Sequence, residues 1–348
     1  MRLLVTGHRG YIGAVLVPRL LKAGHQVTGL DTDLYRACDF GHPAPQGEPV
    51  VQNLETDLRD VAGEHLEGID AVIHLAGLSN DPLGDLDPVL THEINTGATL
   101  RLARAARTAG VKRFLFSSSC SNYGASGTDD WLAEDAPLHP VTPYAVSKVR
   151  AEDALDALAD TDFSPVFLRS ATAYGVSPRI RFDLVVNNLT AWAVATGKVR
   201  LKSDGSAWRP LVHIADISRA FECALAAPRD LVHRQAFNVG RNADCMQIRD
   251  LADRVRRGVP GAEISFARGA AADQRTYRVE CTKIEGIGFK ARWTVEAGIA
   301  ELRAALTETP VPVDAFEGQR FGRVAHIRHL MERGALDARL QRTASAAA

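Results

Sequence analysis

The chain has 348 residues, of which 46% are hydrophobic, and its formal net charge at pH 7 is −1. This length and composition are sufficient for one large domain, or two closely joined ones, with a substantial core. Acidic and basic residues are mixed along the chain instead of gathered in blocks, which excludes nucleic acid and an anionic membrane surface as expected partners. We therefore expect a small-molecule partner.

The cysteine pattern and the hydrophobic pattern indicate where the protein works. The five cysteines are widely scattered with no CxxC spacing, so we predict neither a disulfide framework nor a bound metal. An apolar run at residues 3–5 leads directly into a glycine turn, which leaves no room for a signal peptide. No apolar stretch approaches the ~20 residues that a membrane-spanning helix requires. We expect a soluble, cytoplasmic protein.

In the first half of the chain, short apolar runs alternate with longer segments of helical pattern. This alternation is typical of repeated strand-helix-strand units, which build a parallel sheet with helices on both faces. We therefore predict a doubly wound α/β fold, a Rossmann domain, over residues 1–170. Its strands are expected at residues 2–6, 26–31, 71–75, 113–117 and 165–169.

The second half is broken into shorter pieces by glycine and proline, which predicts a smaller α+β lobe over residues 171–310. The run 235–239 is expected to return to the main sheet. Residues 311–348 read as a helical extension whose role the sequence does not indicate. From about Thr343 the tail is too small and polar to be buried, so we expect it to be poorly ordered.

A glycine-rich turn joins the first predicted strand to the first predicted helix. Glycines there allow a tight turn and bring backbone amides close to a pyrophosphate, while the helix N-terminus offers a partial positive charge. The GxxGxxG spacing is a weak signal by itself, but its position between strand and helix predicts a dinucleotide cofactor. The expected contacts are Gly7, Gly10, Tyr11, Ile12 and Gly13.

Asp31, at the end of the second predicted strand, distinguishes between two cofactors. Its carboxylate can accept hydrogen bonds from the adenosine ribose of NAD and would repel the 2′-phosphate of NADP. Arg9, within the glycine turn, is the residue that favours NADP, because a guanidinium there can bind a phosphate. We predict NAD and keep NADP as the alternative.

Tyr144 and Lys148 belong to a stretch with helical composition. At positions i and i+4 they lie on one helix face, so the Lys148 ammonium, with the nicotinamide cation, favours the phenolate form of Tyr144. A phenol with a lowered pKa can act as general base toward a sugar hydroxyl. Ser117 and Ser119 end a predicted strand, where open α/β sheets bind ligands. We predict Ser119, Tyr144 and Lys148 as catalytic residues, and Ser117, Tyr144 and Lys148 as cofactor contacts.

Together these features resemble the extended short-chain dehydrogenase/reductases, and within them the UDP-galactose 4-epimerase-like nucleotide-sugar epimerases and dehydratases. The resemblance runs from residue 1 to about residue 305. It implies an NAD-dependent enzyme with a nucleotide-sugar substrate, and a homodimer formed through helices at residues 89–108 and 144–159. Further cofactor contacts implied by the resemblance are Asp57, Leu58, Leu75, Ala76, Gly77 and Asn95.

Substrate contacts are also implied by the resemblance: Ser79, Asn80, Ser119, Thr172, Asn187, Asn188, Arg209 and Arg275. The two arginines suit a diphosphate, because a guanidinium binds phosphate oxygens in a bidentate manner. Thr172 departs from the family, which commonly has asparagine there, and the loop at residues 79–82 is unlike that of the epimerases. We therefore do not predict UDP-galactose as the substrate, and the nucleotide and sugar stay open.

The residues beside Ser119 bear on the reaction that follows oxidation of the sugar at C4. In the 4,6-dehydratases the catalytic threonine is followed by an aspartate and a glutamate, whereas Cys120 and Ser121 stand here. A serine of ordinary pKa does not replace a carboxylate in water loss, so dehydration is not expected. Simple return of the hydride gives 4-epimerisation without a further acid or base, and this is our prediction.

Three alternatives stay open. Cys120 can be a catalytic proton shuttle in C3 or C5 epimerisation, or a buried packing residue. The same Ser119, Tyr144 and Lys148 would serve an NAD(P)H-dependent ketoreductase of deoxysugar assembly. A remote alternative is a non-enzymatic dinucleotide sensor of the same fold.

Overall fold

The computed structural model describes residues 1–41, 52–125, 130–267 and 275–343. Its central element is a seven-stranded parallel sheet with the strand order β11-β7-β5-β4-β1-β2-β3. The strands are β1 (Arg2–Thr6), β2 (Gln26–Leu30), β3 (Gln52–Leu54), β4 (Ala71–His74), β5 (Arg113–Ser119), β7 (Ser164–Ser170) and β11 (Gln235–Val239). The strand order reverses between β1 and β4, and a crevice for ligands is expected there, outside the carboxyl ends of the strands.

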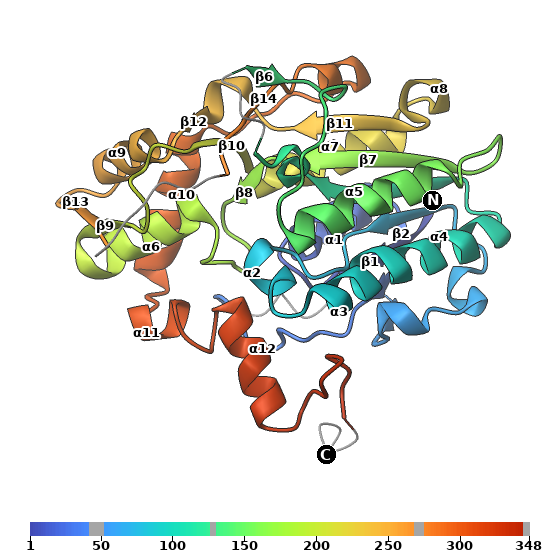
Figure 1. The fold of residues 1–348 in the computed structure, drawn as a ribbon, viewed down its shortest axis with the longest axis horizontal. Helices are drawn as coiled ribbons and strands as arrows, with labels where there is room; N and C mark the ends of the chain where they lie inside the picture. The colour runs from blue at the N-terminus through green and yellow to red at the C-terminus, as the bar shows by residue number, and fades with distance from the viewer. Residues whose placement is uncertain (42–51, 126–129, 268–274, 344–348) are drawn as a thin grey trace.

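Helices cover both faces of this sheet (Figure 1), so the predicted doubly wound fold is confirmed. One face packs against α1 (Gly13–Lys22) and α7 (Ile214–Ala226), and the other against α4 (Thr99–Thr108) and α5 (Pro143–Asp156). Successive side chains of a strand point to opposite faces, and both faces are buried here. This explains why the strands read as continuous apolar runs instead of alternating ones.

A smaller lobe lies over the carboxyl end of the sheet. Its strands form a three-stranded sheet, β12-β10-β8, and two pairs, β13-β9 and β14-β6. The strands are β6 (Trp131–Leu132), β8 (Thr172–Tyr174), β9 (Lys198–Leu201), β10 (Trp208–His213), β12 (Cys245–Gln247), β13 (Glu263–Phe266) and β14 (Arg278–Val279). Helices α6 (Val185–Thr196), α9 (Ile248–Gly258) and α10 (Val295–Glu308) complete the lobe.

Short helical segments connect these elements. The short α-helices are α2 (Asp81–Gly84), α3 (Pro88–His92), α8 (Arg229–Val232) and α11 (Val313–Phe316). The 3₁₀ segments are η1 (Leu58–Asp60), η2 (Gly63–Leu66), η4 (Cys120–Tyr123), η5 (Asn242–Asp244) and η6 (Lys283–Ile287), and η3 (Glu93–Ala98) is a π-helical turn between α3 and α4.

The C-terminal extension packs against both parts of the molecule. Phe316 and Phe321 belong to the core of the small lobe. Helix α12 (Arg323–Glu332) lies close to α2 (Figure 1). It buries Ile327 in a cluster with Leu78 and Leu83, which follow β4. The extension therefore links the small lobe to the sheet edge that carries the crevice. Residues 344–348, for which we expected poor order, lie outside the described residues.

Two contacts tie the extension to the loop after β2. The Arg323 guanidinium lies 3.8 Å from the centre of the Tyr35 ring, and Arg342 Nη2 donates a hydrogen bond to the carbonyl of Thr32 at 2.9 Å. Among the described residues, no helix combines the length and apolar character needed to cross a membrane.

Candidate active site

The glycine turn between β1 and α1 forms a cradle in which side chains do not fit. Gly7 has a φ of +72°, and a Cβ on Gly13 would lie 2.4 Å from the carbonyl oxygen of Gly7. A Cβ on Gly7 itself would lie 2.8 Å from the backbone nitrogen of Ala76. The turn therefore lies directly against the end of β4, with the N-terminus of α1 facing the crevice, and its backbone fits a dinucleotide pyrophosphate.

Tyr11 and Ile12, predicted in this turn, have different surroundings. The Ile12 side chain lines the large cavity described below. The Tyr11 side chain is buried, and its hydroxyl donates a hydrogen bond to the carbonyl of Gly175 at 2.8 Å. Tyr11 therefore holds the turn against the small lobe, and only its backbone is left to face a cofactor.

Acidic groups surround the end of β2. The Asp31 carboxylate accepts hydrogen bonds from the backbone nitrogens of Arg9 at 3.0 Å and Asp33 at 2.8 Å. The Arg9 guanidinium, the reason for considering NADP, lies 2.9 Å from the carboxylate of Asp33 and 3.7 Å from that of Glu55. These carboxylates balance the charge of Arg9, so the residues here fit the ribose of NAD better than a 2′-phosphate.

Three of the cofactor contacts implied by the resemblance, namely Asp57, Leu58 and Asn95, interact with other residues of the protein. Asp57 begins η1 and forms a 2.6 Å ion pair with Arg59, and Leu58 is buried. Asn95 lies in the π-helical turn η3. Turns of this kind often occur at functional sites. The Asn95 side chain accepts a hydrogen bond from the backbone nitrogen of Leu78 and donates to Ser147 Oγ at 3.0 Å.

The prediction that Asn95 contacts the cofactor directly is corrected by this geometry. The residue is 2% exposed, and its amide also donates to the carbonyl of Leu78. A Cβ on Gly77 would lie 2.8 Å from Asn95 Oδ1, so the amide packs directly beneath the backbone there. Asn95 positions the segment 75–77, of which Leu75 and Gly77 line the cavity.

A cavity of about 870 Å³ opens at the carboxyl edge of the sheet and extends into the small lobe. Tyr144, Lys148, Ser117 and Ser119 line it. Tyr144 lies in the first turn of α5, which begins after Thr142, whose hydroxyl accepts a hydrogen bond from the backbone nitrogen of Ala145. A threonine cap followed by proline is a strong helix start, so the local sequence sets the position of Tyr144.

Tyr144 and Ser119 line this cavity together. Burial raises the pKa of Tyr144 to about 12, while Ser119 and the charge of Arg181 act to lower it. Lys148 lies with its Nζ 5.8 Å from the centre of the Tyr144 ring and donates to the carbonyl of Ser117 at 2.8 Å. Burial lowers the pKa of Lys148 to about 8. The three predicted catalytic side chains thus meet at one place.

Cys120, for which the sequence left open a proton shuttle or a buried packing residue, does not line this cavity. It is 1% exposed, belongs to the core on the α1 side of the sheet, and donates its thiol hydrogen to the carbonyl of Arg169 at 3.1 Å. Burial also raises the pKa of Cys120 above its ordinary value. This burial argues against the catalytic alternative for Cys120 and favours the packing interpretation. Ser121, the next residue, lines the cavity instead.

Most of the predicted substrate contacts also line the cavity: Ser79, Asn80, Ser119, Thr172, Asn188, Arg209 and Arg275. Asn187 is the exception, because it is fully buried. Its Oδ1 accepts from the backbone nitrogen of Gly175 at 2.9 Å, and its Nδ2 donates to the carbonyl of Arg181 at 2.9 Å. The prediction for Asn187 is corrected: the residue holds the loop before α6, and its neighbour Asn188 lies at the cavity.

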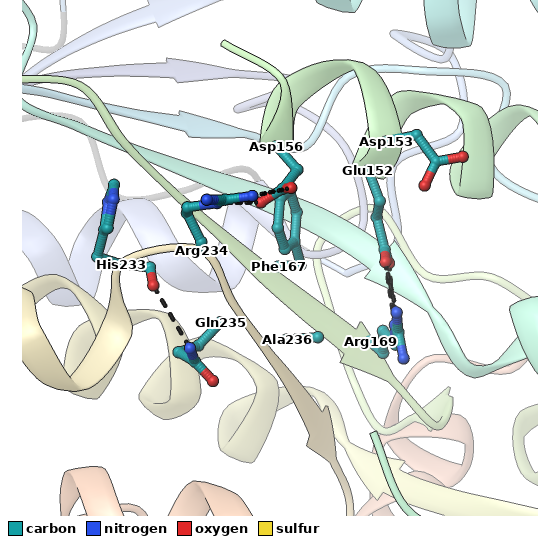
Figure 2. Close-up of a pocket in the computed structure, with 9 residues that line it drawn as sticks. All are labelled: Glu152, Asp153, Asp156, Phe167, Arg169, His233, Arg234, Gln235 and Ala236. Carbon is teal, nitrogen blue, oxygen red and sulfur yellow. Dashed lines mark hydrogen bonds and ion pairs between the residues drawn. The ribbon is translucent and has the colours of Figure 1, made fainter. Parts of the chain in front are cut away.

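A second cavity, of about 500 Å³, lies at the other side of α5, beside β7 and β11 (Figure 2). Its central contact is a buried ion pair, in which Arg169 Nη2 lies 2.7 Å from Glu152 Oε2. Glu152 also accepts hydrogen bonds from Ser118 Oγ and, at 3.0 Å, from Asn122 Nδ2. This cluster supports the end of β5 from behind, and so helps to fix Ser119 on the opposite side.

Residues 3–240 match the family model described as the NAD dependent epimerase/dehydratase family. The chain belongs to this family. A UDP-glucose 4-epimerase of Mycolicibacterium smegmatis is 30% identical to it over 314 residues, which are 86% of this chain and 97% of that protein. The predicted family, the prediction of an enzyme and the prediction of NAD as its cofactor are confirmed.

Solved structures of related enzymes are similar as well. MoeE5 in complex with UDP-glucuronic acid and NAD is 26% identical, with a TM-score of 0.75 over 88% of this chain and 99% of that one. DesIV, a dTDP-glucose 4,6-dehydratase of Streptomyces venezuelae with NAD bound, is 25% identical, with a TM-score of 0.76 over 88% of this chain and 97% of that one. An epimerase and a dehydratase of this family are thus 30% and 25% identical to this chain in sequence.

Several cavity residues of this family member escaped the sequence analysis. Arg181 and Asp183 form a 2.5 Å ion pair, and Arg181 Nη1 donates to Ser79 Oγ at 3.3 Å. The alternation of charged and apolar residues before α6 was a signal for this pair. Tyr277 and Glu317 also line the cavity, and they lie in segments where no sequence motif marked them.

Proposed function

We propose that this family member is an NAD-dependent nucleotide-sugar 4-epimerase. The observation that carries the proposal is that the carboxylates around the cavity are ion-paired. In the described part of the chain, Asp81, Asp183 and Glu317 line it, and each is paired with a cation: Arg275 at 2.5 Å, Arg181 at 2.5 Å and Lys202 at 3.0 Å. A dehydratase needs a carboxyl group able to give up or take a proton beside the sugar, and ion-paired carboxylates are poor candidates.

Position 121 supports the same conclusion. The side chain that faces the cavity beside Ser119 is the hydroxyl of Ser121, where the dehydratases carry a carboxylate. Ser119 and Tyr144 are then sufficient for the chemistry, because epimerisation at C4 requires proton transfer at one oxygen only. We infer no step that forms or breaks a bond to C5 or C6.

In this proposal the glycine turn, Asp31, Leu75, Gly77, Ser117 and Lys148 would hold the cofactor, with Asp31 suited to its ribose. NAD bound there supplies the hydride acceptor and donor. Residues 1–170 together with β11 would form the cofactor-binding domain, residues 171–310 most of the substrate lobe, and residues 311–348 an extension that closes it.

Because burial raises the pKa of Tyr144 to about 12 in the chain alone, the phenolate form would depend on the added positive charge of the bound nicotinamide. As phenolate, Tyr144 takes the proton of the C4 hydroxyl, and Ser119 donates a hydrogen bond to the oxygen as it becomes a ketone. The keto-sugar then presents its other face, and Tyr144 returns the proton to the same oxygen. A cavity of about 870 Å³ leaves room for this reorientation. Arg209, Arg275 and Asn188 are proposed to hold the diphosphate during it, because two guanidinium groups and an amide suit phosphate oxygens.

The test is stoichiometric. Purified protein is supplied with UDP-, dTDP-, GDP- and CDP-sugars, and the products are separated by chromatography while NADH absorbance is followed. An epimerase converts a sugar into its C4 epimer with no net change in NADH. Continuous consumption of NAD(P)H would replace the proposal by the ketoreductase alternative, and a product lighter by one water would replace it by a dehydratase.

A homodimer is part of the proposal. Helices α4 and α5 pack side by side on one face of the sheet (Figure 1), which supports pairing of two chains through a four-helix contact. Light scattering on the purified protein tests it, with twice the mass of 37.6 kDa as the expected result.

A further inference from the structure

Asp81 joins the large domain to the small lobe at the edge of the reaction cavity. It lies at the start of α2, and its side chain is 16% exposed. One of its carboxylate oxygens, Oδ1, accepts a hydrogen bond from the Thr142 hydroxyl at 2.6 Å. The other, Oδ2, lies 2.5 Å from Arg275 Nη1 of the small lobe. All three residues line the cavity, so one carboxylate connects two of its walls.

The Thr142 hydroxyl is also the cap of α5, the helix that carries Tyr144. While it donates to Asp81, it accepts a hydrogen bond from the backbone nitrogen of Ala145 at 3.2 Å. Tyr144 lies two residues after this cap, in the first turn of α5. Helix α2 packs against the same turn, because a Cβ on Gly84 would lie 3.0 Å from the backbone nitrogen of Tyr144. The position of Asp81 relative to Tyr144 is therefore set by a hydrogen bond and by packing.

Arg275 is a suitable group to connect Asp81 with a phosphate. A guanidinium presents five N–H donors in a fixed fork, so one arginine can bind a carboxylate and a phosphate at the same time. The Arg275 side chain is 42% exposed and lines the cavity, in which the proposed function places the diphosphate. An anion at this arginine would be two contacts away from the helix that carries the base.

A second contact joins the same segment of the large domain to the small lobe. Asn80 Nδ2 donates to Asp183 Oδ2 at 2.5 Å, and Asp183 is paired with Arg181. Asn80 also caps α2, because its Oδ1 accepts a hydrogen bond from the backbone nitrogen of Leu83 at 2.9 Å. The place of this segment therefore does not depend on Asp81 alone, and we expect variants of Asp81 to keep the fold.

We propose that Asp81 is a positioning residue that fixes Arg275, and with it the diphosphate of the substrate, relative to Tyr144. This inference rests on the proposed function, in which Arg275 helps to hold the diphosphate and Tyr144 is the base. Epimerisation at C4 requires the keto-sugar to reorient while the diphosphate stays in place, so the distance from the diphosphate to the phenol oxygen has to be kept. Asp81 keeps it through Arg275 and Thr142, and it takes no part in proton transfer.

The experiment breaks this connection at each of its two contacts. In Asp81→Asn the amide oxygen still accepts from Thr142, but the charge that holds Arg275 is lost. In Thr142→Val the contact with Arg275 stays, and the contact with α5 is lost. We expect kcat on the plateau of the pH profile to fall about five- to fiftyfold in each variant, because the bound sugar is misplaced at the phenol. KM should change less than kcat.

Further variants separate this effect from a loss of structure or of charge. Thr142→Ser keeps the hydroxyl and should recover most of kcat. The double variant should add little to either single one, because both break the same connection. Asp156→Asn, which removes the partner of Arg234 at the other end of α5 (Figure 2), is the matched control and should leave both constants unchanged. The charge of Asp81 raises the pKa of Tyr144, so a purely electrostatic effect of Asp81→Asn would instead increase kcat at low pH.

A second readout does not require turnover. Binding of UDP, dTDP, GDP and CDP to the NAD-loaded protein is measured by calorimetry in Arg275→Gln, Asp81→Asn and the double variant. Arg275→Gln should weaken the preferred diphosphate about tenfold or more, because a cation is lost and the Asp81 carboxylate is left without its partner. Asp81→Asn alone should not weaken it, and in the Arg275→Gln background it should recover part of the lost affinity.

The proposal is overturned if kcat of Asp81→Asn equals that of the wild type, rises only at low pH, or is unchanged while KM alone rises. Losses that multiply in the double variant of Asp81 and Thr142 overturn it as well, as does an affinity of Arg275→Gln that Asp81→Asn leaves unchanged. If the wild type binds a nucleoside diphosphate but converts no nucleotide sugar, the proposed function fails, and the binding measurements still decide whether Asp81 acts on Arg275. A wild type that binds none of the four overturns both. If Asp81→Asn does not fold, Thr142→Val compared with Thr142→Ser tests the same connection.

Discussion

Glu317 of the C-terminal extension accepts a hydrogen bond from the indole nitrogen of Trp192 at 2.8 Å. The same carboxylate accepts hydrogen bonds from Asn188 Nδ2 at 3.1 Å and from Lys202 Nζ at 3.0 Å. The extension therefore supplies a group that holds two side chains of the substrate cavity in place. In this way a segment without any recognised motif becomes part of the cavity wall.

Replacement of Glu317 by alanine should weaken substrate binding more than the chemical step. Asn188 and Lys202 lose the carboxylate that orients them, whereas Ser119 and Tyr144 keep their surroundings. We expect KM to rise a few-fold while kcat stays within twofold, measured by steady-state kinetics on the active nucleotide sugar. Glu296→Ala, which removes an exposed partner of Arg254, is the matched control and should leave both constants unchanged. A loss confined to kcat would contradict this role.

Replacement of Tyr144 by phenylalanine should abolish turnover and leave NAD bound. The phenol oxygen is the group that exchanges the proton with the sugar, whereas the ring itself keeps the wall of the cavity intact. The loss expected for a general base is about 10²- to 10⁴-fold in kcat. Bound NAD is measured after denaturation of the purified variant, and an empty variant would show that the substitution disturbs the cofactor site instead.

Cys120 should be dispensable for catalysis. Its thiol points into the core toward the carbonyl of Arg169, so removal of the sulfur in Cys120→Ala costs packing but no proton transfer. We expect a loss of about 1 kcal/mol in the free energy of unfolding and less than a twofold change in kcat. A kcat reduced a hundredfold in a stable Cys120→Ala variant would restore the C3 or C5 epimerase hypothesis.

The buried pair of Glu152 and Arg169 should be essential for stability. In Glu152→Ala the Arg169 guanidinium is left buried without its carboxylate, which costs about 3 to 5 kcal/mol in the free energy of unfolding. The control is Glu222→Ala, which breaks the partly exposed pair with Arg19 and should cost about 0 to 1 kcal/mol. Urea unfolding curves measure both. Equal losses in the two variants would refute the role given to the buried cluster.

Lys148 should make stability depend on pH in the alkaline range. Burial lowers its pKa from 10.5 to about 8 in the folded chain, so between these two values the unfolded chain binds more protons than the folded one. The free energy of unfolding contributed by Lys148 therefore rises as the pH increases from about 8 toward 10.5, and it is lowest below pH 8, where the buried ammonium is charged. We expect the difference in stability between the wild type and Lys148→Met to change in that direction across this window. A difference that is constant with pH would contradict the burial of a charged Lys148.

The sequence by itself determined the doubly wound fold, the family, the cofactor and the meeting of Ser119 with Tyr144. These features follow from local or nearly local patterns: buried strands leave apolar runs, a glycine turn needs residues without a Cβ, and a threonine-proline cap starts α5 just before Tyr144. The physical cause of each lies within a few residues of the feature, and so the sequence shows it.

Only the tertiary structure decided the direction of individual side chains at the cavity. Cys120 and Ser121 are neighbours in the sequence, but the turn after β5 buries the first and exposes the second to the cavity. Asn187 and Asn188 differ in the same way: Asn187 is buried in the small lobe, whereas Asn188 lines the cavity. Tyr277 and Glu317 reach the cavity from segments far along the chain, through packing of the small lobe and the extension. Contacts of this kind depend on which surfaces meet when the chain is folded, and no periodicity or spacing in the sequence records that.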